Sequence, residues 1–165
     1  MFISCNNLCL GLLRFLLQFE KNGEVSKLRR DAREAAYKVL YAENYNGISE
    51  ESFIKEIYDE QKLIKADKVF ADKLIDCVRT HREEIEKIIS DYAKGYKLER
   101  LYSTDKCALM LAIAEMKYFD DIPAVVSIDE ALCLVRKYST EESLKFVNGI
   151  LASFKKNAEE KASDN

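Results

Sequence analysis

The sequence contains the run Cys107-Ala-Leu-Met-Leu-Ala-Ile-Ala-Glu-Met116, which is apolar at nearly every position apart from Glu115. A helix that is hydrophobic on all sides is buried on all sides. Ser103 or Thr104 can cap this helix, and Asp120-Asp121-Ile122-Pro123 breaks the chain after it. We therefore expect a central buried helix around which the C-terminal half of the protein is built.

Helical patterns also dominate the rest of the chain from Lys27 onward. No segment shows the alternation of apolar and polar residues that is typical of a strand. The 165 residues include one proline and five glycines, so long helices with short connections are expected. The sequence predicts one all-α protein of about seven helices.

Two helix starts are marked by capping residues near the C-terminus. Ser127 and Glu130 have the spacing of a capping box, and Thr140 precedes a helix with acidic residues in its first turn. The chain becomes polar from Lys155 onward, and we expect this tail to fray.

The stretch from Leu28 to Tyr41 predicts a helix with two different faces. At about 100° per residue, its apolar arc holds Leu28, Ala32, Ala35 and Val39. The opposite face holds Arg30, Arg33, Tyr37 and Tyr41, with Arg29 on its flank. Guanidinium and phenol groups on an outer face suit contact with RNA. The alternative is a solvated face with local pairs to Asp31 or Glu34.

Phe146 is out of phase with the helix that carries it. The core stripe of that helix is formed by Leu144, Val147, Leu151 and Phe154. Phe146 points nearly the other way, so it either fills a second interface or is exposed for stacking. Gly149 leaves bare backbone beside it, and this suggests close approach by a partner.

The sequence carries no pattern that specifies an active site, a cofactor or a metal. Its one histidine, His81, has no nearby nucleophile and no second histidine, and no glycine-rich phosphate loop occurs. We therefore expect no catalytic residue, no cofactor and no metal, and we expect that the protein is not an enzyme. The formal charge of −3 means that nucleic-acid binding would have to come from a local basic patch.

The five cysteines are scattered and form no CxxC pair. They are Cys5, Cys9, Cys77, Cys107 and Cys133. Free thiols in a reducing cytoplasm fit this pattern better than disulfides or a zinc site.

Three stretches together resemble the family of the transcription antitermination factor NusB. They are Arg29-Arg-Asp-Ala-Arg33 with Val39-Leu-Tyr41, Ile122-Pro-Ala-Val-Val-Ser-Ile-Asp-Glu-Ala131, and Lys145-Phe-Val-Asn-Gly-Ile-Leu151. The resemblance covers about residues 26–157. It implies an all-α fold of two packed small bundles, about 26–93 and about 94–157, followed by a polar tail at 158–165.

The resemblance also implies a function. Members of the family pair with the small-subunit ribosomal protein NusE, bind boxA-type single-stranded RNA of nascent ribosomal RNA leaders, and join elongating RNA polymerase to suppress termination. The positions implied to contact RNA are Arg29, Arg30, Arg33, Tyr41, Lys145 and Phe146. Those implied to face the protein partner are Tyr92, Asp105 and Glu142. Self-association through the partner surface stays open, and no membrane role is implied.

Some residues depart from the family pattern. Asp31 stands where many relatives carry a further basic residue, which weakens the patch. Met110 and Ala114 stand where relatives often have Arg and Tyr, and this puts the strength of partner binding in question.

Residues 1–25 lie outside the resemblance as an N-terminal extension. The apolar run from Leu8 to Phe19 is too short to span a bilayer and lacks the features of a signal peptide. An added amphipathic helix, a membrane-surface segment and translation from an upstream start remain as interpretations. We favour the upstream start, because the family-like region begins near Ser26, and we expect a cytoplasmic protein.

Two alternative functions remain beside antitermination. One is a NusB-like RNA-binding module of an RNA-modifying enzyme, which would need a methyltransferase domain that this chain is too short to hold. The other is a helical protein–protein adaptor without an RNA role.

Overall fold

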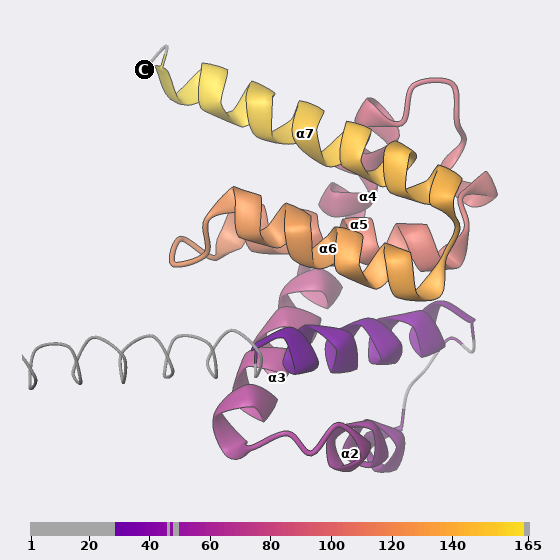
Figure 1. The fold of residues 1–165 in the computed structure, drawn as a ribbon, viewed down its shortest axis with the longest axis vertical. Coiled ribbons are helices and arrows are strands. Elements are labelled where there is room, and N and C mark those ends of the chain that lie inside the picture. Colours follow the sequence, from indigo (N-terminus) through magenta and orange to yellow (C-terminus); the bar gives the residue numbers. More distant parts are fainter. Residues whose placement is uncertain (1–28, 46, 48–49, 164–165) are drawn as a thin grey trace, which may run out of the picture.

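The structure, a computed structural model, describes residues 29–45, 47 and 50–163, and its regular elements are all helical (Figure 1). A helix covers residues 29–45. It is followed by α2 (Glu51–Glu60), α3 (Lys65–Thr80), α4 (Arg82–Tyr92), the short 3-10 helix η1 (Leu98–Arg100), α5 (Ser103–Tyr118), α6 (Ala124–Tyr138) and α7 (Glu141–Ser163). The predicted all-α architecture is confirmed. The N-terminal extension lies outside the described residues.

Helix α5 is the central helix, as its apolar sequence predicts. Every side chain from Cys107 to Glu115 is buried, and α3, α4, α6 and α7 all pack against α5. The start of the helix differs from the prediction. It begins at Ser103 after an extended Tyr102, and no side chain caps it. None of the described helices is long and apolar enough to cross a membrane.

The helix of residues 29–45 is enclosed on two sides. It lies beside α6, and α2 lies on its other side (Figure 1). Ala32, Ala35 and Val39 face the core, as predicted. The predicted outer face is wrong for Arg33 and Tyr37, because both side chains are buried. The neighbouring helices supply carboxylates and aromatic rings that cover this face.

Arg33 forms the buried link between four helices. Its Nε donates to Oε1 of Glu115 in α5 at 2.5 Å, and Ser127 of α6 donates its hydroxyl to Oε2 of the same carboxylate at 2.9 Å. The guanidinium carbon also lies 5.2 Å from the ring centre of Phe70 in α3. A buried charge is tolerated only when it is paired and hydrogen-bonded, and this arrangement provides both.

The predicted capping box at Ser127 and Glu130 is not formed. Helix α6 begins earlier, at Ala124, directly after Pro123, whose fixed φ suits a helix start. Both side chains are therefore inside the helix, where Ser127 binds Glu115 and Glu130 accepts hydrogen bonds from Arg30. Contacts with other helices therefore replace the local cap that the spacing predicted.

Helix α7 begins as predicted but extends further. The backbone N–H of Ser143 donates to Oγ1 of Thr140 at 3.2 Å, so the predicted cap is confirmed. The expected fraying from Lys155 is wrong, because the helix continues to Ser163. Pairs spaced four residues apart, Lys155 with Glu159 and Lys156 with Glu160, support this exposed extension.

We predict that Arg33→Ala destabilises the protein by about 3 to 5 kcal/mol, because Glu115 would remain buried without a cation. Replacing both partners by apolar residues, Arg33→Met with Glu115→Leu, should recover most of the loss. Urea unfolding measures both effects. Lys87→Ala is the control, since it removes only the exposed pair with Asp91, and it should leave the unfolding midpoint almost unchanged. A loss below about 1 kcal/mol for Arg33→Ala would contradict the role of this pair.

Candidate nucleic-acid interface

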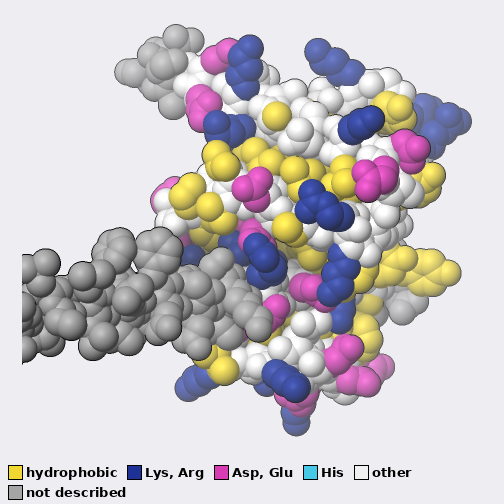
Figure 2. All heavy atoms as spheres, viewed as in Figure 1, with side chains coloured by type: hydrophobic (Ala, Val, Ile, Leu, Met, Phe, Trp, Pro, Cys, Tyr) yellow, Lys and Arg dark blue, Asp and Glu magenta, His cyan; other side chains and the backbone are white. Residues whose placement is uncertain are grey.

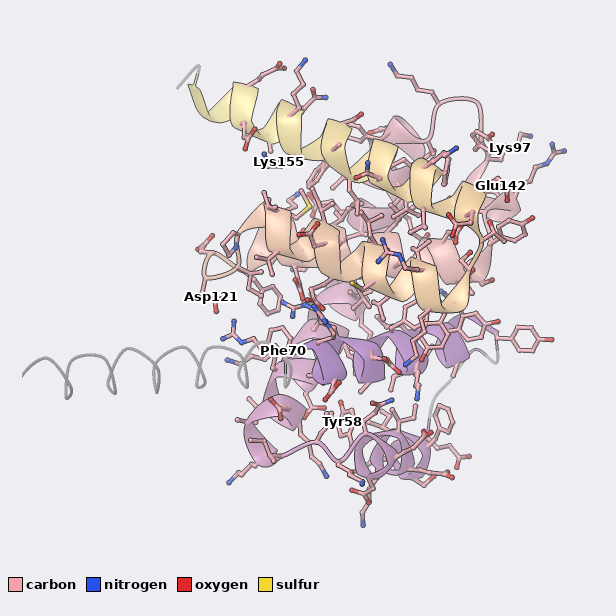
Figure 3. The ribbon with its side chains drawn as sticks, in the orientation of Figure 1. Tyr58, Phe70, Lys97, Asp121, Glu142 and Lys155 are labelled. Atoms are coloured by element: carbon pink, nitrogen blue, oxygen red, sulfur yellow. The ribbon has the colours of Figure 1, made fainter. Side chains whose placement is uncertain are left out.

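Five of the six positions implied to contact RNA form two groups along α6, and the sixth, Tyr41, lies apart from the arginines. Arg29 pairs with Asp121 just before this helix and Arg30 pairs with Glu130 near its middle, whereas Lys145 and Phe146 lie just beyond its end, in the first turns of α7. In Figure 3 the labelled Asp121 and Glu142 lie beyond the two ends of α6. The stretch from Glu130 to the end of α6 rises about 12 Å, so the two groups contact separate parts of a ligand.

Arg29 and Arg30 are accessible and are held by carboxylates. Arg29 reaches Asp121 at 3.4 Å and lies over the ring of Phe70, with 5.3 Å from its guanidinium carbon to the ring centre. Arg30 donates from Nε and Nη2 to both oxygens of Glu130, with shortest distances of 3.0 and 2.8 Å. The hydrogen bonds and charge of Glu130 raise the pKa of Arg30 above its ordinary value. Both cations are therefore fixed in place while part of each guanidinium remains open to solvent.

Arg33 is not available to a ligand. Its side chain is 7% exposed and its Nε is bound to Glu115, so contact with RNA would require the buried pair to break. The implied RNA contact is therefore replaced by a structural role. Spacing within the helix could not have shown this, because Glu115 is 82 positions away in the sequence.

Glu34 accepts hydrogen bonds from three residues, two in α6 and one just after α2. Lys137 donates to both of its oxygens at 2.7 and 2.8 Å, Tyr138 donates at 2.7 Å, and Gln61 donates at 3.1 Å. Lys38 lies 3.8 Å away on the same helix. Burial alone would raise the pKa of Glu34, but the hydrogen bonds from Lys137 and Tyr138 outweigh it and lower the pKa below its ordinary value.

A pocket of about 220 Å³ opens between the helix of residues 29–45 and α6. Arg30 and Glu130 line it near the middle of α6, and Glu34 and Lys137 line it about two turns further along. Figure 2 shows Lys and Arg side chains mixed with Asp and Glu over the face formed by these helices and α7. The surface is therefore a set of ion pairs and is not a uniformly basic patch.

Tyr41 lies at the other end of its helix from the arginines. Its ring is partly exposed and stacks on the buried ring of Tyr37 at 6.4 Å between centroids. The hydroxyl of Tyr37 donates to the backbone oxygen of Thr104, and Asn44 donates to the sulfur of Cys107. The end of this helix therefore lies against the start of α5, away from Arg29 and Arg30.

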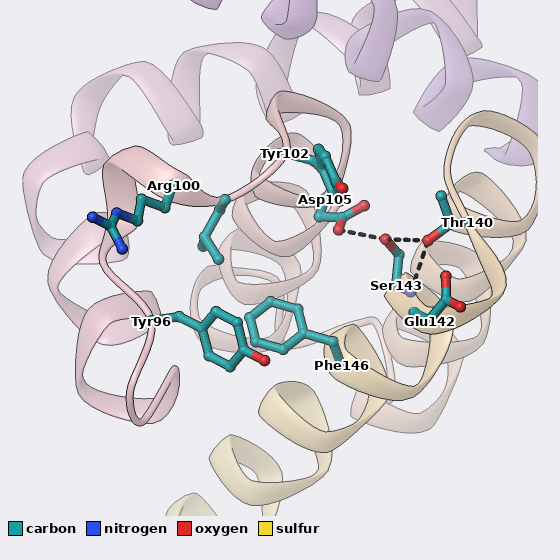
Figure 4. A pocket seen from close by; sticks show the side chains of 9 residues that line it. Tyr96, Arg100, Tyr102, Asp105, Thr140, Glu142, Ser143 and Phe146 are labelled. Atoms are coloured by element: carbon teal, nitrogen blue, oxygen red, sulfur yellow. Dashed lines mark hydrogen bonds between the residues drawn. The ribbon is translucent and has the colours of Figure 1, made fainter.

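Phe146 forms one wall of a groove of about 390 Å³ at the start of α7 (Figure 4). Its ring meets Tyr96 edge to face at 5.1 Å, while Tyr102 and Glu142 line the rim. The side chain is half-buried, so it packs on Tyr96 and also presents an edge to the groove. The preceding Lys145 is exposed. The two interpretations of the out-of-phase Phe146 both have a basis in this geometry.

The implied partner residues are only partly brought together. Asp105 is buried in the floor of the groove, where it accepts hydrogen bonds from the hydroxyls of Ser139 at 2.5 Å and Ser143 at 2.7 Å. Glu142 is exposed on the same groove. Tyr92 lies in a separate cleft between α4 and α7, where it accepts a hydrogen bond from Asn157. Asp105 therefore holds the turn between α6 and α7 in place.

The residues that depart from the family pattern in α5 are not on a surface. Met110 and Ala114 are fully buried, so their identity bears on core packing rather than on contact with a partner. The thiol of Cys107 is also buried, which raises its pKa to about 11. Within the described part of the chain, Cys77, Cys107 and Cys133 are free thiols, and no cluster of metal-ligating residues occurs.

Comparison with known proteins assigns the chain to a family. Residues 30–156 match the profile of the NusB family. The chain belongs to the NusB family. The matched region lies inside the range 26–157 predicted from the motifs.

Several NusB relatives and structures are similar along most of this chain. The transcription antitermination protein NusB of Methylacidiphilum infernorum is 41% identical over 135 residues, which cover 81% of this chain and 94% of the relative. NusB of Bacillus subtilis is 33% identical over 132 residues, covering 80% and 98%. A crystal structure of the antitermination factors NusB and NusE with double-stranded RNA matches with a TM-score of 0.72 at 31% identity, covering 79% of this chain and 98% of that one.

Two residues of this NusB-family surface, Lys137 and Tyr96, are not predicted by the motifs. Lys137 lies in the last turn of α6 and is drawn to the pocket by Glu34, and Tyr96 precedes η1 and supports Phe146. Neither residue belongs to a motif. Only the packing of helices distant in the sequence brings them to the site.

We predict that Glu34→Gln lowers the free energy of unfolding at neutral pH and makes this free energy depend less on pH in acid. The folded pKa of Glu34 lies below its ordinary value of 4.5, so its contribution is present above that pH and is lost as the pH falls through the folded pKa. Urea unfolding of wild type and variant between pH 7 and pH 3 measures the difference. The two curves should converge in acid, and curves that stay parallel would contradict the prediction.

Proposed function

We propose that this chain is a transcription antitermination factor that binds boxA-type single-stranded RNA together with NusE. The complex would join elongating RNA polymerase and suppress termination in ribosomal RNA operons. Membership of the NusB family over residues 30–156 carries this proposal. A similar structure holds NusB with NusE and double-stranded RNA, which supports NusE and RNA as classes of partner.

Arg29 and Arg30 would bind phosphate groups of the RNA along the first half of α6. Arg29 and Arg30 keep exposed guanidinium surface, and their carboxylate partners hold them in a fixed position. A guanidinium that is already ordered loses little rotamer freedom when a phosphate binds. Arg33 stays behind this surface as a support, so the proposal no longer includes it among the RNA contacts.

Phe146 and Lys145 would form the second contact. The ring of Phe146 can stack on an unpaired base, while the exposed Lys145 beside it can reach the backbone. Base stacking tolerates many sequences, so this contact adds affinity without fixing every base. Contact elements at both ends of α6 suit an extended strand better than a compact ligand.

Tyr41, which the family resemblance implied as an RNA contact, lies apart from Arg29 and Arg30, and we propose that the protein partner docks at the end of the molecule that carries Tyr41 and Glu142. Tyr41, Tyr45 and Tyr102 are exposed there, around the start of α5. Exposed tyrosines are common at protein interfaces because they combine an apolar ring with a polar tip. Asp105 and Tyr92 would act behind this surface by holding the neighbouring helices.

The proposed activity needs no catalytic group. The similar relatives are transcription antitermination proteins, which supports a role in binding and assembly. We accordingly propose a non-catalytic protein that acts in the cytoplasm, where ribosomal RNA is transcribed.

The direct test is binding of a labelled boxA-type RNA by the chain alone and with NusE, across a series of salt concentrations. We expect weak binding alone, tighter binding with NusE, and affinity that falls with salt. A duplex of the same sequence should bind less well, because its bases are not free to stack on Phe146. Binding no tighter than that of a scrambled RNA, with and without NusE, would overturn the proposal.

We predict that Arg30→Ala and Phe146→Ala weaken RNA binding in different ways. Loss of a phosphate contact should reduce the slope of log affinity against log salt by about 0.7. Loss of a stacked base should cost about 1 to 3 kcal/mol with little change in slope. Phe53→Ala on α2 is the control for loss of a part-exposed phenylalanine and should bind as wild type does. Equal slopes for Arg30→Ala and wild type would contradict the phosphate contact.

A further inference from the structure

In the pocket between the helix of residues 29–45 and α6, the cations are more exposed than the carboxylates that pair with them. The side chains of Arg30 and Lys137 are 53% and 56% exposed, whereas their partners Glu130 and Glu34 are only 9% and 12% exposed. The cations therefore face solvent and the carboxylates lie beneath them. Arg29 and Asp121 show the reverse order, since there the carboxylate is the more exposed partner.

Arg30 keeps a donor for a ligand, and Lys137 keeps an exposed charge. Arg30 uses Nε and Nη2 for Glu130, and its Nη1 has no hydrogen-bond partner among the described residues. Lys137 donates to Glu34 and lies 5.3 Å from the centre of the ring of Tyr138. A phosphate that approaches from solvent meets these cations before it meets a carboxylate. The buried partners fix the cations and are shielded from the ligand by them.

Lys137 also lies between the two proposed contact elements. It is about 10 Å further along α6 than Glu130, the residue that binds Arg30. The helix ends at the next residue, and the turn that follows leads directly into α7 and Phe146. A strand that runs from Arg30 to the groove of Phe146 along α6 would pass over Lys137.

We propose that Lys137 is an RNA-phosphate contact, which binds the strand with Arg30 at the mouth of this pocket and links the arginines to the Phe146 groove. This inference rests on the proposed function, because it names a further contact of the same RNA. It assigns the site to the backbone of the strand and leaves base recognition to the aromatic residues.

The test compares Lys137→Gln with Lys38→Gln, using the same boxA-type RNA and NusE. Lys38 also pairs with Glu34, but its side chain is only 25% exposed and it also approaches Glu60 of α2. Both variants remove one positive charge from the same cluster. Because each charge lies beside Glu34, both variants should lower the thermal unfolding midpoint, and RNA binding is compared at a temperature where each variant is folded.

We expect Lys137→Gln to bind RNA about three to ten times more weakly and to reduce the salt slope by about 0.7. Lys38→Gln should keep the wild-type slope, and Lys137→Arg should restore both quantities. If the wild type binds the RNA specifically and the two glutamine variants have equal salt slopes, this inference alone is overturned. Absence of specific binding by the wild type would overturn the proposed function, and with it this inference.

Discussion

The ion pair between Arg33 and Glu115 determines how the helices are arranged around the central α5. It lies in the interior, where an isolated charge would be strongly unfavourable, so each partner requires the other. Through Ser127 and Phe70 the same contact reaches α6 and α3. The helix of residues 29–45 is therefore held in a fixed position relative to α5. Because Arg30 lies nearly one turn earlier on that helix, it is placed opposite Glu130 at the surface.

Much of the fold could be predicted from local patterns. The run from Cys107 to Met116 is apolar around nearly its whole circumference, and a helix of this kind and length is buried in the core. The small residues Ala32 and Ala35 likewise marked a packed face. Thr140 was identified as a cap because its partner, the backbone of Ser143, is only three residues away. These features depend on short-range spacing, which the sequence displays directly.

Four misassigned side chains, Arg33, Tyr37, Ser127 and Glu130, depend on partners in other helices. Arg33 and Tyr37 were expected on the outer face, since helical spacing gives the angle between side chains but not what lies opposite each one. Ser127 and Glu130 had the spacing of a cap, yet their partners are Glu115 and Arg30. A polar side chain can be buried only where another group pairs with it, so its burial is not predictable before that partner is known. The motifs identified the helices that carry the candidate site. The packing of those helices determines which of their side chains are accessible.

Arg29, Arg30 and Lys137 are each paired with a carboxylate, and this bears on selectivity in a solution crowded with polyanions. A nearly neutral face exerts little long-range attraction, so RNA in general is not drawn to it by its charge. Encounters with ribosomes, transfer RNA or DNA would be brief, because phosphates alone gain little there. Prolonged residence would require a strand that offers unstacked bases and a second protein that adds contacts. The paired charges would thereby keep the protein free until both are present on the same transcript.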